Sequence, residues 1–71
     1  MKLFRIFPDR CRQFETVATS HEMAYRGICS FYNADTKIAV MDTETGNVKV
    51  YSRVLDKKGN LLRIVEHDKV W

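Results

Sequence analysis

Two turn sequences of the same kind constrain this fold more than any other feature: Thr43-Glu44-Thr45-Gly46-Asn47 and Asp56-Lys57-Lys58-Gly59-Asn60. Each offers a polar residue, two intervening residues and then glycine. This spacing is typical of a type I turn followed by a residue in the left-handed region, which glycine adopts without a steric penalty. The turns therefore predict two successive hairpins, an antiparallel meander with strands over residues 36–42, 47–55 and 61–67.

The first eighteen residues predict two further extended segments. Residues 3–7 are aromatic and β-branched, and Pro8 ends this strand because proline cannot donate to a ladder. Residues 14–18 form the second segment. The pattern leaves open whether these segments make a hairpin or one strand with an irregular excursion.

The polar residues that follow predict one helix, over residues 20–32. Thr19 followed by Glu22 is a capping-box pattern, in which the hydroxyl accepts from an early helix N–H and the carboxylate reaches back. Gly27 costs about 1 kcal/mol relative to alanine in a helix, so we expect a close approach to the sheet there. The residues expected to face the sheet are Ala24, Gly27, Ile28 and Phe31, with Tyr32 beside them.

Together these elements predict the α+β class. We expect an antiparallel sheet of three to five strands with one helix packed on one face, in the approximate order β-(β)-α-β-β-β. Residues 1–71 form a single domain, because a chain of 71 residues has no room for a second. A domain this small buries roughly 60% of the surface that its unfolded chain exposes, so its stability is marginal.

The turns also predict a register. If each turn closes through its polar residue and its asparagine, Arg53 opposes both Lys37 and Arg63. One face of the meander then meets the helix, and it contains Ile38, Val40, Val48, Val50, Val54, Leu62 and Ile64.

The other face of the predicted meander is basic and aromatic. Like charges directly opposite each other destabilise a sheet, so a row of three cations suggests an anionic or acidic partner. The alternative is a solvated face whose long side chains splay apart, and both interpretations stay open. Rows of Ala39, Tyr51 and Val65 and of Met41, Lys49 and His67 are expected beside the cations. The predicted partner-binding residues are Lys37, Lys49, Tyr51, Arg53 and Arg63.

No residue pattern predicts catalysis, a metal or a cofactor. His21 and His67 are the only histidines, and no spacing joins them to a nucleophile. Cys11 and Cys29 have no zinc-type spacing, and we expect free thiols in a reducing cytosol. We therefore expect a non-enzyme.

The charge and hydropathy of the chain are those of a small basic domain. The formal net charge of +3 is compatible with nucleic acid or an acidic protein surface and requires neither. No apolar run approaches the ~20 residues of a membrane helix, and the N-terminus shows no secretory signal. We expect a cytoplasmic protein. Its final tryptophan, Trp71, is expected to cover a sheet edge, with a partner anchor as the alternative.

The run from Phe14 to Ala24, FETVATSHEMA, followed by a meander, resembles the layout of very small phage-encoded proteins. Some anti-CRISPR proteins and some small phage inhibitors of host RNA polymerase have a similar strand, capped helix and following strands. The resemblance covers residues 14–65, with Met23 where alanine is common. It implies a compact protein that binds and blocks a larger host machine.

The leading hypothesis is a protein-binding module, phage or mobile-element encoded, that inhibits a host protein or nucleoprotein complex by occluding a functional surface. The alternative is direct binding of single-stranded or double-stranded nucleic acid by the basic face, with Tyr51 available for stacking. A homodimer joined through its sheet edge or face also stays open.

Overall fold

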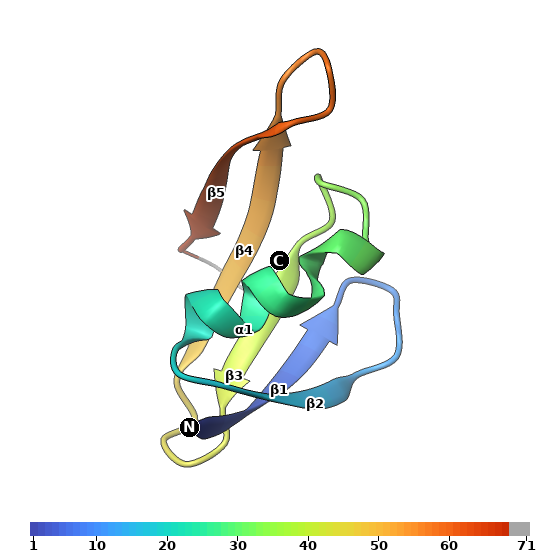
Figure 1. The fold of residues 1–71 in the computed structure, drawn as a ribbon. Coiled ribbons are helices and arrows are strands. Elements are labelled where there is room, and N and C mark those ends of the chain that lie inside the picture. The colour runs from blue at the N-terminus through green and yellow to red at the C-terminus, as the bar shows by residue number, and fades with distance from the viewer. Residues whose placement is uncertain (69–71) are drawn as a thin grey trace.

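The computed structural model describes residues 1–68, which form a five-stranded antiparallel sheet with one short helix on one face (Figure 1). This is the predicted α+β class. None of the helices in this range is long and apolar enough to cross a membrane. The predicted role of Trp71 lies outside the described residues. The elements are β1 (Lys2–Pro8), β2 (Phe14–Ala18), α1 (His21–Ile28), the 3-10 helix η1 (Cys29–Phe31), β3 (Ile38–Asp42), β4 (Val48–Leu55) and β5 (Leu61–His67).

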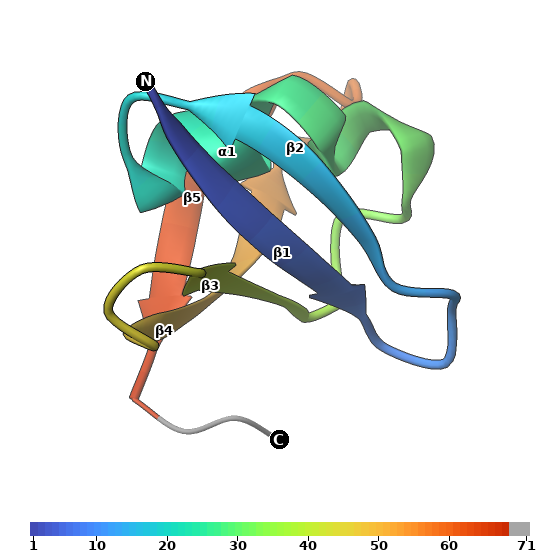
Figure 2. The same ribbon diagram turned by 90° about the horizontal axis from the view of Figure 1, so that it is seen from below.

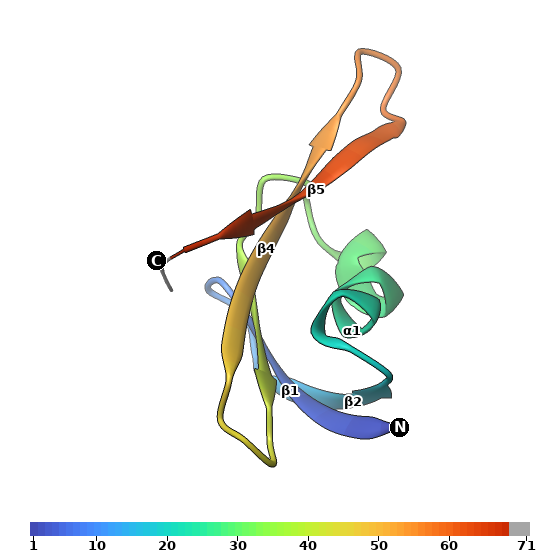
Figure 3. The ribbon, with the colours of Figure 1, turned by 90° about the vertical axis from the view of Figure 1, so that its left-hand side faces the viewer.

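The strands lie in the order β2-β1-β3-β4-β5, and every neighbouring pair is antiparallel. The N-terminal segments therefore form a hairpin, which the sequence left open. The sheet is twisted, so the strands of the β1–β2 hairpin run obliquely to those of the β4–β5 hairpin, as the view from below shows (Figure 2). Seen from the side, α1 lies on one face of the sheet, and the far end of the β4–β5 hairpin extends past it (Figure 3).

The helix begins one residue later than the sequence predicts. Ser20, not Thr19, is the N-cap, and its Oγ accepts from the Met23 N–H at 3.2 Å. Ser20 has extended φ and ψ angles, which an N-cap residue requires. The α-helix ends at Ile28 and continues as η1, so the predicted helical spacing fails beyond this point.

The core lies between α1 and the three middle strands. Ala24, Ile28, Ile38 and Val40 face it as predicted. Tyr25, which the prediction omitted, is among the largest fully buried side chains. Other core residues are Phe4, Ile6, Ala18, Cys29 and Tyr51.

Two residues assigned to the sheet-facing side of the helix lie outside the core. Phe31 is 79% exposed, because the tighter turn of η1 changes the direction of its side chain. A Cβ built on Gly27 would meet no atom within 4 Å, so the expected close approach to the sheet is absent. The cost of this glycine is not offset by any internal packing.

The two similar turn sequences close differently. In the β3–β4 turn, Asp42 and Asn47 close the ladder, and the Gly46 N–H donates to the Asp42 carbonyl at 2.8 Å. Thr43 does not close this turn as predicted, because its N–H and hydroxyl both donate to the Leu3 carbonyl of β1. The first loop is therefore one residue longer than the sequence pattern suggests.

The β4–β5 turn closes as predicted, and the register then slips. Asp56 donates its N–H to the Asn60 carbonyl at 2.9 Å, and Gly59 has a φ of 87°. Leu55 opposes Leu61, but Val54 opposes Arg63. Leu62 therefore has no partner in the ladder and forms a β-bulge.

These two local differences overturn the predicted faces. A slip of one residue moves a side chain to the other side of a sheet. Tyr51 now opposes Ile38 on the helix side, while Val50 opposes Ala39 on the other side. Val48, Val50 and Val54 thus lie on the face away from α1, where the sequence placed Tyr51.

Candidate partner-binding site

The predicted basic row of Lys37, Arg53 and Arg63 does not form. Arg53 opposes Ile64, Arg63 opposes Val54, and Lys37 precedes β3. Lys49 opposes Val40 on the helix side of the sheet, where its side chain is exposed. The predicted rows that place Ala39 beside Tyr51 and Met41 beside Lys49 are wrong for the same reason. The five residues expected to bind a partner therefore do not share one surface.

Tyr51 is a core residue rather than an exposed aromatic platform. It is 3% exposed and stacks on Tyr25, with 5.2 Å between the ring centroids. Burial raises the pKa of each of these two phenols from 10.0 to about 12. Neither ring can stack on a base.

Arg53 ties the connection after the helix to β4. Its guanidinium donates to the Tyr32 carbonyl, and its backbone N–H donates to the Ala34 carbonyl at 2.8 Å. Its Nε is buried and has no hydrogen-bond acceptor among residues 1–68. The side chain is half-buried and helps to hold the connection, so it is not free to reach a large ligand.

An exposed apolar cluster lies instead at the end of the β4–β5 hairpin. Leu55 is 38% exposed, Leu61 51% and Leu62 64%. The bulge accounts for Leu62, because an unpaired extra residue re-aims its side chain away from the regular ladder. This end of the hairpin extends beyond the rest of the sheet in Figures 1 and 3.

Exposed cations surround these leucines. Lys57 and Lys58 occupy the turn, and Arg63 follows the bulge. None of the three forms an ion pair within the described part of the chain. We call this surface the hairpin tip, and it consists of Leu55, Lys57, Lys58, Leu61, Leu62 and Arg63.

Asp56 stabilises the turn of the hairpin tip through hydrogen bonds to the backbone. Its Oδ1 accepts from the Asn60 N–H at 2.8 Å and from the Lys58 N–H at 2.9 Å. These bonds, led by the one from Asn60, lower the pKa of the carboxyl. The Asp56 side chain thus orders the backbone of the turn, which presents the leucines on a preorganised scaffold.

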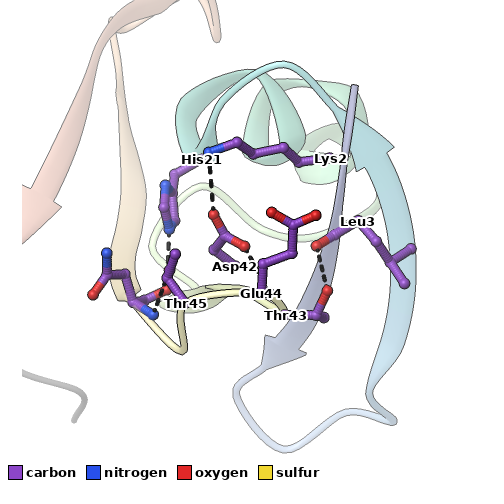
Figure 4. A network of polar contacts seen from close by, with 8 residues as sticks. Lys2, Leu3, His21, Asp42, Thr43, Glu44 and Thr45 are labelled. Carbon is purple, nitrogen blue, oxygen red and sulfur yellow. Dashed lines mark hydrogen bonds and ion pairs between the residues drawn. The ribbon is translucent and has the colours of Figure 1, made fainter.

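The opposite end of the sheet carries a polar network around Asp42 (Figure 4). The buried carboxylate accepts from the Glu44 N–H at 2.9 Å and pairs with Lys2 at 3.4 Å. His21 bonds the Asn47 carbonyl through Nε2 at 3.0 Å and packs edge-on against Phe4. This network joins β1, α1 and the β3–β4 turn, so its chemistry is structural.

Sequence reasoning missed one polar pair, Ser52 with His67. Its Oγ and Nε2 atoms are 2.8 Å apart on neighbouring strands, on the face away from α1. Nucleophilic catalysis needs a third group that orients the histidine, and the described residues provide no hydrogen bond to its other nitrogen. His67 lies two residues beyond Val65, which is directly opposite Ser52. The sequence could have indicated this diagonal pair only if the register of the two strands had been predicted correctly.

The described residues contain no group of three or more side chains that could hold a metal ion. Cys11 is exposed, Cys29 is buried, and both are free thiols. No family model, curated protein or solved structure matches this chain.

Proposed function

We propose that this protein is a binding module that inserts the leucines of its hairpin tip into an apolar recess on an acidic protein surface. The observation that carries the proposal is the exposure of Leu55, Leu61 and Leu62 together on one ordered, projecting hairpin. A few fully desolvated side chains near the centre of an interface supply most of its binding free energy, and the contacts around them exclude water. Lys57, Lys58 and Arg63 provide a cationic rim that favours acidic partners.

The composition of the tip supports a protein partner over nucleic acid. Single-stranded nucleic acids are bound by cations together with aromatic side chains on which bases stack. The hairpin tip has leucines and no aromatic residue, and Tyr51 is buried. The nucleic-acid alternative relied on a basic sheet face with Tyr51 available for stacking, so the burial of Tyr51 and the absence of the predicted basic row count against it.

The proposed action is inhibition by occlusion. A projecting hairpin can enter a recess that a larger machine uses for its own substrate, while the rest of the domain blocks the entrance. This action is the one implied by the resemblance to small phage inhibitors, and a phage or mobile-element origin is part of the same proposal. The target is then a host protein or nucleoprotein complex.

Capture from a bacterial lysate tests the proposal, with nuclease-treated and untreated samples compared. The test variant combines Leu61→Ser and Leu62→Ser. The matched control combines Val17→Ser and Met23→Ser, which also removes two exposed apolar side chains, but from β2 and α1. We expect wild type and control to capture the same stoichiometric protein after nuclease treatment, and the tip variant to lose it.

Two outcomes would overturn the proposal. If the tip variant captures the protein as well as wild type does, the tip is not the binding surface. If every captured protein disappears with nuclease, the partner is nucleic acid.

A further inference from the structure

We draw no further inference here: the strongest candidate, an open cavity of about 370 Å³ beside β2 that is lined by Arg5, Gln13, Phe14 and Glu15, carries nothing, because its two charged side chains are half-exposed and already pair with each other at 3.2 Å, and nothing in the structure shows what would occupy it.

Discussion

At the scale of single residues, burial separates the side chains that hold the fold from those that can bind. Tyr51 and Arg53 have the composition of a binding hot spot, yet one stacks in the core and the other bonds the Tyr32 carbonyl. The sequence placed both side chains on the face away from the helix, and the structure shows that this placement is wrong. Only the register decides that side, and residue type carries no information about it.

Asp42 is the residue whose titration should be visible in stability. The N–H of Glu44, followed by the Lys2 ammonium, lowers the pKa of its carboxyl below the ordinary value. A lowered folded pKa stabilises the protein above the unfolded value, near pH 4, and this contribution is lost as the pH falls through the folded pKa.

We therefore expect Asp42→Asn to lower the free energy of unfolding more at about pH 7 than at about pH 3. Asparagine keeps an oxygen that can accept from the Glu44 N–H, so the variant isolates the charge. Urea unfolding of both proteins at the two pH values measures the difference. An equal loss at both values would contradict the assignment of this carboxylate to the network in Figure 4.

At the scale of elements, the sequence predicted the strands and the antiparallel meander correctly, but not the residue register within the meander. Five strands and one helix follow from β-branched runs, turn glycines and a polar cap, which are local signals. The closure of the β3–β4 turn depends on Thr43 bonding Leu3, forty residues away. No local pattern in the β4–β5 hairpin marks Leu62 as unpaired. These two details moved the candidate site from the sheet face to the hairpin tip.

The glycines of different elements should respond oppositely to alanine. Gly59→Ala places a Cβ at a φ of 87°, and the left-handed region costs a non-glycine residue about 1–2 kcal/mol. Gly27→Ala adds a methyl group to an exposed helix position with no neighbour within 4 Å, and alanine is favoured there by about 1 kcal/mol. Thermal unfolding should thus show a lower midpoint for Gly59→Ala and a higher one for Gly27→Ala. A lower midpoint for Gly27→Ala would contradict the open space around Gly27 and would support the close approach to the sheet that the sequence suggested.

At the scale of the whole molecule, the two ends of the sheet have different roles. One end holds β1, α1 and the β3–β4 turn together through the Asp42 network. The other end is the hairpin tip, where three leucines are exposed among cations that form no ion pair within residues 1–68. None of the three leucines belongs to the core, so their exposure is not required by the packing of the fold. This asymmetry is the physical basis of the binding-module proposal.

The most direct measurement of that proposal is photo-crosslinking in living bacteria from single positions. A benzoylphenylalanine side chain would replace Leu62 at the tip and, in a separate control, Val17 on β2; both positions are exposed. We expect one crosslinked host protein from position 62 and none from position 17. Crosslinks from position 17 with none from position 62 would contradict the account and move the partner-binding surface away from the hairpin tip.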